Sequence, residues 1–326
     1  MKSSEDSFWA VNMINSIEEI PFLLLIILGF IVGLLGGLLG IGGGWLIIPT
    51  LHSFGVSMVS AVATGLAQMM GTSLISLERH HRLGNVDFTL GGVIGLFMIP
   101  AVFGGRTFLL YLEKMGHAGT LTRMLYIVLL TFIGLRMIFG ALGKKSDIKK
   151  DNLLSRMANP LRFGPVITLK KSQKKVYLPV LCCIGLLGGF LSGIMGLGGG
   201  FILVPCMTYI IGVSALEAIA ATLVCVFFAS VSGSFLYNLS GKVYWDFAGY
   251  ILIGSFFGSL IGVASTQYVK DKNLRLLFGV VLFFAALSSL SKQLKFFQLA
   301  QFLILIPAGI ILVYTLASLI KGKLKR

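Results

Sequence analysis

The chain has 326 residues, of which 56% are hydrophobic and only 12% are charged. A soluble domain carries about twice that share of charged residues. The composition therefore excludes a water-soluble globular protein and indicates a chain whose apolar segments lie in a bilayer. A membrane-spanning helix needs about 20 mostly apolar residues, and the sequence supplies such stretches almost from end to end.

The formal net charge of +15 is concentrated in two places. More than half of it lies in the segment 144–175, and Lys321, Lys323, Lys325 and Arg326 supply most of the rest. Both lie beside long apolar runs, where excess Lys and Arg mark the cytoplasmic side of a membrane. We therefore predict a multi-pass protein of the inner (cytoplasmic) membrane, with the linker and C-terminus in the cytoplasm. Membrane lipids are expected partners of this charge, and nucleic acid is not.

Residues 1–20 are expected to form a polar or interfacial segment at the start of the chain. The first membrane repeat then covers residues 21–143. Run length and helix breakers predict its helices over 21–55, with a break at the glycines, and over 57–77, 88–112 and 121–142. Residues 144–175 are predicted to form the basic linker.

The second membrane repeat is predicted over residues 176–291. Its helices are expected over 176–212, again with a break, and over 214–239, 247–269 and 274–290. Residues 292–326 add a further transmembrane helix, predicted over 296–319, and the basic tail. The predicted fold class is thus an all-α integral membrane bundle built from two homologous repeats.

The duplication is visible in the sequence itself. The run GLLGGLLGIGGGWLIIP from Gly33 matches GFLSGIMGLGGGFILVP from Gly189. The tripeptide Gly-Val-Ser at 55–57 recurs at 212–214, and Gly-Xaa-Val at 84–86 recurs at 241–243. Self-similarity over most of each half indicates a duplicated unit.

Topology favours repeats that are inverted relative to each other. As a single helix, each leading run would exceed about 50 Å, so it cannot be one span. If the linker and the C-terminus share one side, each leading run must cross twice, and each repeat then crosses an odd number of times. Odd-numbered repeats are inverted in the membrane, as in many secondary transporters. The alternative is a re-entrant second limb, which would place one positive cluster on the wrong side.

Glycine-rich breaks lie in the middle of both leading runs, where unpaired backbone is tolerated only if it is buried or lines a polar cavity. The residues after each break are expected to start a half-helix, whose free N–H groups and positive end attract an anion. The predicted substrate-binding glycines are Gly42, Gly43, Gly44, Gly198, Gly199 and Gly200. The alternative is that these glycines only let helices approach closely. Triple glycine in both halves, followed five residues later by proline, favours the anion site.

Further polar residues are candidates for the same site. Thr64 and Gln68 share a helix face with Thr72, and Thr222 lies in the other half. These side chains are expected either to complete the coordination of an oxyanion or to hydrogen-bond between helices. Arg106, which follows two glycines, is a candidate for an anion pathway, although snorkelling to the interface also explains a charge near a helix end.

Titratable residues gather around the turn at Gly84. They are Glu78, His80, His81 and Asp87. Histidine suits proton coupling because it titrates near neutral pH, but the loop position favours a solvated charge cluster. Glu217, three residues after Ser214, is predicted to cap a helix. The four cysteines lie in apolar runs without metal-ligand spacing, and helix packing is expected of them.

The duplicated G-x-x-x-G-x-G-G-G motif, followed by an apolar stretch and proline, resembles that of the TauE/SafE sulfite exporter-like permeases. The resemblance covers roughly residues 22–290. It implies a carrier of small sulfur-containing anions, such as sulfite, sulfoacetate or aryl sulfonates. It also implies a bacterial cytoplasmic membrane and coupling to a proton gradient.

The predicted function is therefore secondary transport of a small anion by alternating access, with protons as the coupling ion. The alternatives are an anion channel of the same architecture, or a non-transporting scaffold that recruits a partner through the basic linker. No enzyme is predicted, because the sequence lacks the HExxH, GxxxxGK[ST] and GxSxG motifs. We predict no catalytic residue, metal or cofactor, and the sequence leaves the oligomeric state open.

Overall fold

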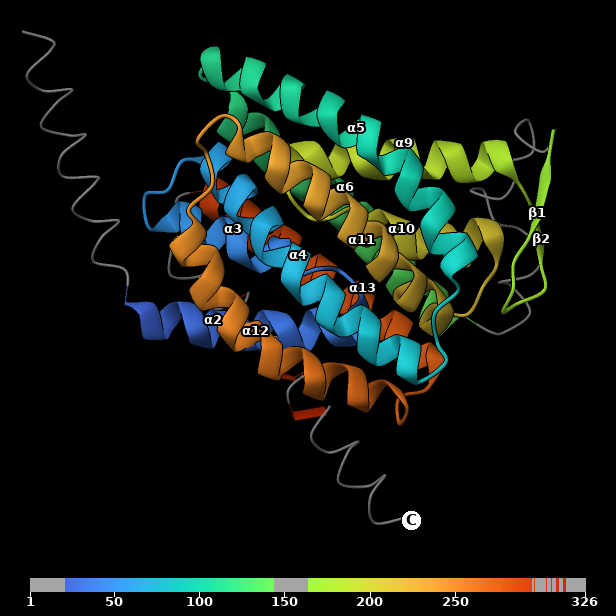
Figure 1. Ribbon diagram of the computed structural model, residues 1–326. Coiled ribbons are helices and arrows are strands. Elements are labelled where there is room, and N and C mark those ends of the chain that lie inside the picture. The colour runs from blue at the N-terminus through green and yellow to red at the C-terminus, as the bar shows by residue number, and fades with distance from the viewer. Residues whose placement is uncertain are drawn as a thin grey trace, which may run out of the picture.

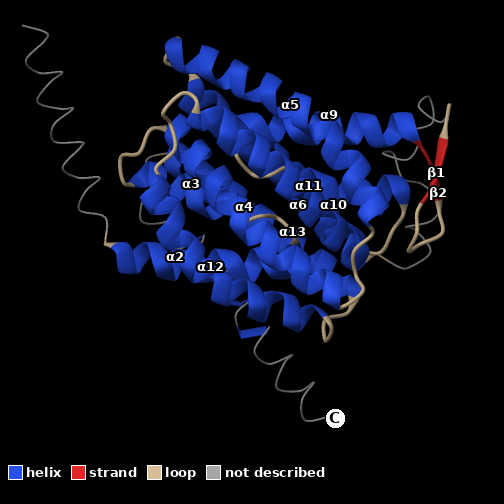
Figure 2. Ribbon diagram, in the orientation of Figure 1, coloured by secondary structure: helices blue, strands red, loops and turns tan. Residues whose placement is uncertain are grey.

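The computed structural model describes residues 21–143, 164–294 and 296, together with 303, 306, 309, 310, 313 and 314. The predicted N-terminal segment, much of the linker, and most of the last helix and tail lie outside these residues. Helices make up nearly all of the described chain (Figure 2). Eight of them are long and apolar enough to cross a membrane. The prediction of an all-helical, multi-pass membrane protein is confirmed.

The helices of the first half are α2 (Phe22–Leu39), α3 (Gly44–Ser53), α4 (Met58–Arg82), α5 (Phe88–Lys114) and α6 (Ala118–Leu142). Side chains cap the starts of two of them. The Ser57 hydroxyl accepts a hydrogen bond from the amide of Ser60 at the start of α4, and Asp87 accepts from Thr89 and Leu90 at the start of α5. Such caps satisfy amides that have no partner within the helix.

The second half contains α9 (Leu178–Met195), α10 (Gly200–Cys206), the π-helix η2 (Met207–Ile211), α11 (Ala215–Asn238), α12 (Trp245–Thr266) and α13 (Asp271–Gln293). Before α9, the linker forms an unpredicted hairpin of two short antiparallel strands, β1 (Val166–Thr168) and β2 (Lys175–Tyr177). Charge dominates this segment, but Leu169 and Val176 are buried. These two apolar side chains anchor the hairpin to the bundle.

The helices pack in pairs drawn from different halves. α4 and α11 contact each other and are the most deeply buried of the long helices. α2 packs on α12, α5 packs on α9, and α6 packs on α13. In Figure 1, α2 and α12 form the lower edge, and α5 and α9 form the upper edge. If each helix is replaced by the helix at the equivalent position of the other half, the same set of pairs results.

Glycines allow the edge pairs to pack backbone against backbone. A Cβ on Gly33 in α2 would lie 2.3 Å from the carbonyl oxygen of Ser255 in α12. A Cβ on Gly258 in α12 would lie 2.0 Å from that of Phe30. In the α5–α9 pair, the corresponding distance from Gly189 to the Met98 carbonyl oxygen is 2.5 Å. Small residues are the usual means of close helix packing in membranes.

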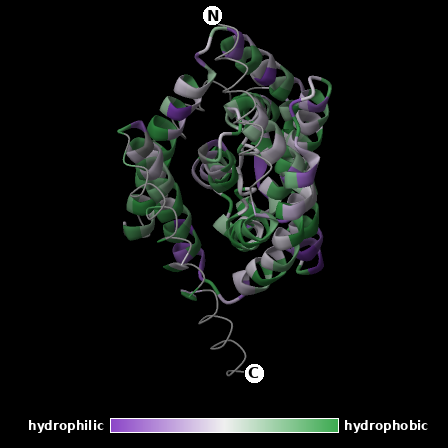
Figure 3. Cartoon of the chain, turned by 90° about the vertical axis from the view of Figure 1, so that its left-hand side faces the viewer, coloured by the Kyte–Doolittle hydropathy of each residue, from purple (hydrophilic) through white to green (hydrophobic). Residues whose placement is uncertain are grey.

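Large apolar side chains cover the outside of the bundle. Phe103, Val128, Phe132, Phe139 and Phe235 are each more than half exposed. Hydrophobic residues occur along the outer helices in the end-on view of Figure 3. A surface of this kind is suited to lipid chains and not to water.

Candidate functional site

The two glycine segments, 40–44 and 196–200, meet in the buried centre of the molecule. The first lies between the end of α2 and the start of α3, and the second between the end of α9 and the start of α10. A Cβ on Gly44 would lie 2.3 Å from the carbonyl oxygen of Gly196, and a Cβ on Gly200 would lie 2.6 Å from that of Gly40. Because such distances exclude any side chain, the two segments are in direct backbone contact.

The same two side chains line both segments. A Cβ on Gly42 would lie 2.7 Å from the Met69 sulfur and 3.1 Å from a methyl group of Val226. A Cβ on Gly198 would meet the same pair, at 2.8 Å from Val226 and 3.4 Å from the Met69 sulfur. Met69 lies in α4 and Val226 lies in α11, so the central helices close the site on this side.

Each segment leads directly into a helix that no side chain of the described residues caps. Gly43 precedes α3 and Gly199 precedes α10, both with left-handed backbone, and neither helix start has a side-chain hydrogen bond. The positive end of a helix dipole and its first amide groups form a favourable environment for an anion. The six predicted glycines are thus brought together, and all of them are buried.

The polar face of α4 mainly joins helices to one another. The Gln68 amide donates to the Thr72 hydroxyl and, at 2.7 Å, to the Ser255 hydroxyl in α12. The Thr64 hydroxyl accepts from the amide of Tyr244 at 3.0 Å. Of the two uses considered for these residues, the structure displays interhelical hydrogen bonding, while the Gln68 carbonyl oxygen is buried without a partner.

Thr222 lies in α11, and its hydroxyl points to the sulfur of Met207 at 3.6 Å. This contact joins α11 to the π-helix η2, which continues α10. Thr222 is fully buried. Its hydrogen bond therefore lies between the second half-helix and the central helix α11.

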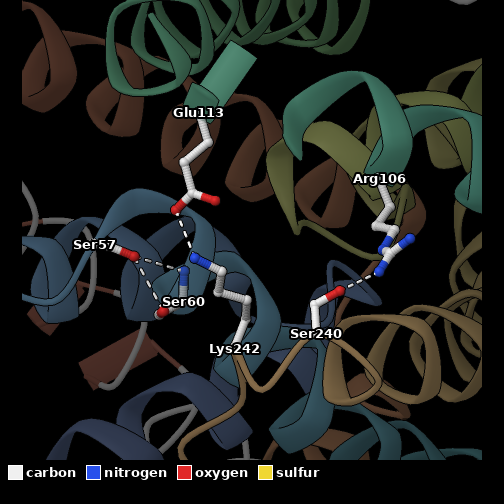
Figure 4. Close-up of polar contacts among 6 residues, drawn as sticks. All are labelled: Ser57, Ser60, Arg106, Glu113, Ser240 and Lys242. Atoms are coloured by element: carbon white, nitrogen blue, oxygen red, sulfur yellow. Dashed lines mark hydrogen bonds and ion pairs between the residues drawn. The ribbon is translucent and has the colours of Figure 1, made fainter. Parts of the chain in front are cut away.

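Arg106 lies beside the last turn of α9 and not within the glycine site. Its guanidinium donates to the Ser240 hydroxyl (Figure 4) and lies 6.0 Å from the centre of the Tyr237 ring. The Tyr237 hydroxyl donates to the Gly193 carbonyl at 2.7 Å. Figure 4 also shows the ion pair of Glu113 and Lys242, at 3.0 Å, near this end of the bundle.

The turn at Gly84 differs from the expected solvated cluster. Glu78 is exposed and pairs with Arg82, but His80 and Asp87 are fully buried. Asp87 is buried because the linker hairpin packs against it. Its carboxylate accepts a hydrogen bond from the backbone amide of Lys171 at 2.9 Å. The expectation of a solvated position is wrong for His80 and Asp87.

The tip of the linker hairpin holds both halves at this face. The Lys171 ammonium donates to the Gly84 carbonyl at 2.7 Å, and the Lys174 ammonium donates to the Gly212 carbonyl. Burial lowers the pKa of Lys171, whereas the carboxylates of Glu217 and Asp87 oppose that shift. The Ser214 hydroxyl accepts from the amide of Glu217 at 3.2 Å and caps α11. The predicted cap by the Glu217 side chain itself does not occur among the described residues.

A cavity of about 30 Å³ adjoins the second glycine segment. It is lined by Ile48, Pro49, His52, Met58, Arg123, Tyr126 and Ser289. The Tyr126 hydroxyl donates to the carbonyl of Met195, the last residue of α9, at 2.9 Å. This volume suits a single water molecule. Sequence reasoning missed Arg123 and Tyr126, because each is an isolated polar residue in an apolar run.

The sequence model of the family described as "Sulfite exporter TauE/SafE" matches residues 25–289. The chain belongs to the TauE/SafE family. It is 26% identical over 274 residues to "Probable membrane transporter protein YunE" of Bacillus subtilis, covering 80% of this chain and 94% of the relative. It is 26% identical over 290 residues to a "Probable membrane transporter protein" of Haemophilus influenzae, covering 83% and 98%. No solved structure gives a significant match.

Membership of the TauE/SafE family makes this chain a membrane transporter and not an enzyme. The predicted resemblance is confirmed over almost the same residues, 25–289 against 22–290. A transporter of this family acts on a small substrate.

Proposed function

We propose that the protein is a secondary transporter of a small sulfur-containing anion, a sulfite-like oxyanion or an organosulfonate. The anion is held between the two glycine segments and moves by alternating access, with protons as the coupling ion. The observation that carries this proposal is the backbone contact between Gly44 and Gly196 and between Gly200 and Gly40, in the buried centre of the molecule.

The chemistry of the glycine segments suits an oxyanion. Glycine leaves the amide groups uncovered, and two half-helices direct their positive ends toward the breaks. A tetrahedral or pyramidal oxyanion offers several acceptor oxygens to such amides. Gln68 and Thr222, one from each central helix, are proposed to adjust the site, and Arg106 is proposed to attract the anion at the end of α9.

The arrangement of the halves supports inverted repeats. α3 and α10 lie toward opposite ends of the bundle, on the left and on the right in Figure 1. The helix pairs are preserved when the halves are exchanged. Two equivalent half-structures of opposite orientation can exchange conformations, and that exchange opens a central site to each side in turn.

The test is uptake of radiolabelled sulfite into proteoliposomes, with and without an imposed pH gradient. Sulfonates, thiosulfate, sulfate and acetate serve as competitors. The proposal predicts saturable uptake that sulfur oxyanions inhibit more strongly than acetate and that a pH gradient accelerates. Liposomes without protein measure the leak. Absence of uptake by correctly inserted protein would overturn the proposal.

A channel is distinguished by its conductance. Planar bilayers containing the protein should give no resolvable single-channel current in sulfite solutions, because a carrier changes conformation for each anion moved. Fast current that does not saturate with sulfite concentration would contradict alternating access. It would leave the family and the glycine site intact.

A further inference from the structure

Two equivalent side chains hold the last turns of α2 and α9, just before the glycine segments. The Tyr237 hydroxyl donates to the Gly193 carbonyl at 2.7 Å, and His80 Nε2 lies 3.1 Å from the Gly37 carbonyl. His80 stands four residues before Gly84, as Tyr237 stands four before its counterpart Gly241. Carbonyls in the last turn of a helix lack a partner within it. Both side chains therefore secure a helix end beside the site.

The two positions differ in one respect, because histidine titrates near neutral pH and tyrosine does not. A carbonyl can only accept, so His80 Nε2 carries a proton in this contact. His80 Nδ1 lies 3.4 Å from the side-chain amide nitrogen of Asn85, Nδ2. It is the ring nitrogen where a second proton can bind. His80 is fully buried, while Asn85 is partly exposed. Asn85 thus lies between the buried imidazole and the surface of the molecule.

Few charged groups among the described residues face His80. α2 carries none, and the only charged side chain of α12 is Asp246 in its first turn, at the far end of that helix. Burial is the main factor that disfavours a charge on His80, and the Lys171 ammonium of the hairpin adds a like charge. Asp87 and Glu217 oppose the charge of Lys171. On α4 itself, Glu78 and Arg82 neutralise each other at the surface, and Arg79 and His81 are exposed.

We propose that His80 is the proton-binding group of this transporter, taking up its proton at Nδ1, the ring nitrogen that faces Asn85. A protonated His80 places a positive charge at the C-terminal, negative end of α2, which favours it. That charge lies one turn before the glycine segment 40–44 and attracts the anion there. By reciprocity, a bound anion then strengthens proton binding to the same degree. The inference rests on the proposed function and names its coupling residue.

The first experiment compares sulfite uptake by proteoliposomes of the wild type, His80→Gln and His80→Tyr at several pH values between about 5 and 8. Both variants keep a donor for the Gly37 carbonyl but do not titrate in this range, and tyrosine is the residue at the equivalent position. All three proteins meet the same ionisation states of sulfite. A difference between them therefore reports a proton on the protein.

The expected result is an apparent wild-type affinity that increases more steeply as the pH falls than in either variant, by up to about tenfold per pH unit for one linked proton. His80→Gln and His80→Tyr should transport without acceleration by a pH gradient. Tyr237→Phe is the matched control, because it removes the equivalent hydrogen bond but no group that titrates between about pH 5 and 8, and it should keep the wild-type pH response.

The outcomes separate the two levels of the proposal. A wild type that takes up sulfite but ignores the pH gradient would overturn both proton coupling and the role of His80. A gradient response that persists in both variants would overturn the role of His80 alone. Absence of sulfite uptake in the wild type would overturn the proposed substrate, and the second experiment then decides on His80.

The second experiment observes the proton directly. The chain has four histidines, so NMR of protein with isotopically labelled histidine gives few signals, and the His80→Gln spectrum assigns one of them. Added sulfite, or a sulfonate from the panel, should shift the midpoint of that signal's titration to higher pH. A His80 signal that does not titrate between about pH 5 and 8, with or without anion, would overturn the proposal.

Discussion

At the residue scale, Gly43 and Gly199 have the strictest requirements of the proposed site. Their φ angles are 89° and 78°, in the left-handed region that glycine adopts without strain. A Cβ on Gly43 would lie 2.1 Å from a methyl group of Val32, and a Cβ on Gly199 would lie 2.8 Å from the Met98 methyl group. Backbone conformation and packing therefore both exclude a side chain at these positions.

Gly43→Leu and Gly199→Leu are each expected to abolish sulfite uptake, because a side chain would displace the backbone that holds the anion. The left-handed conformation alone adds a cost of about 1–2 kcal/mol. Gly92→Leu and Gly249→Leu are matched controls at equivalent positions where an added Cβ meets nothing within 4 Å. Proteoliposome uptake, normalised to inserted protein, makes the comparison. Normal uptake by both site variants would show that the glycines only serve packing.

The sequence singles out the glycines of both repeats as candidates. It does not show which of them pack one helix on another and which stand at the start of a half-helix. Gly33 allows α2 to pack on α12, whereas Gly43 immediately precedes α3. Both occur in one apolar run. His80 and Asp87 were expected in solvent because they flank a turn. The contact that buries Asp87 comes from Lys171, 84 residues later in the chain. A contact between residues so far apart in the chain leaves no local sequence pattern from which it could be predicted.

At the element scale, the linker hairpin and the start of α5 depend on one carboxylate. Asp87 Oδ1 caps α5 through Thr89 and Leu90, and its Oδ2 accepts the Lys171 amide. Asp87→Ala should lower stability by about 1–2 kcal/mol for the lost cap and release the hairpin. Thermal unfolding in detergent measures the first effect, and proteolysis after Lys171 measures the second.

The control for Asp87 is Asp246→Ala, which removes an exposed carboxylate from the first turn of α12 that caps nothing by a side-chain hydrogen bond. This variant should unfold within a degree or two of the wild type, as surface changes usually do. Equal unfolding temperatures for Asp87→Ala and the wild type would mean that the hairpin and the cap contribute little.

Helix boundaries were predictable to within a few residues wherever apolar runs define them. α4 continues to Arg82, beyond the predicted end at residue 77, because Glu78 and Arg82 pair across one turn and extend the helix. The hairpin was not predictable, since its strands are three residues each within a basic segment. Its few apolar residues lie in or beside the two strands, and Leu169 and Val176 are the buried ones among them.

At the scale of the whole molecule, we predict the orientation in the membrane from the positive charge of the linker. The hairpin contacts the turn before α5 through Lys171 and Gly84. α5 then runs 27 residues to Lys114, which corresponds to about 40 Å. We therefore expect Met115 to emerge on the face opposite Gln173, and the positive-inside rule predicts that Gln173 lies in the cytoplasm.

Single cysteines test this orientation. In a background without Cys182, Cys183, Cys206 and Cys225, Gln173→Cys should react with an impermeant maleimide only after the cells are opened. Met115→Cys should react in intact cells whose outer barrier admits the reagent. Both positions are exposed in the structure. The reverse labelling pattern would mean that the protein has the opposite orientation in the membrane. Labelling of both cysteines from the same side would contradict the arrangement of α5.

The central claim is that two glycine segments form one anion site, and its most direct test is the stoichiometry of sulfite binding. Titration calorimetry on the purified protein is predicted to give one sulfite per chain. Either Gly43→Leu or Gly199→Leu alone should remove the whole signal, because each half supplies part of the same site. Two sulfites per chain, with each variant removing one of them, or binding that neither variant changes, would contradict the claim.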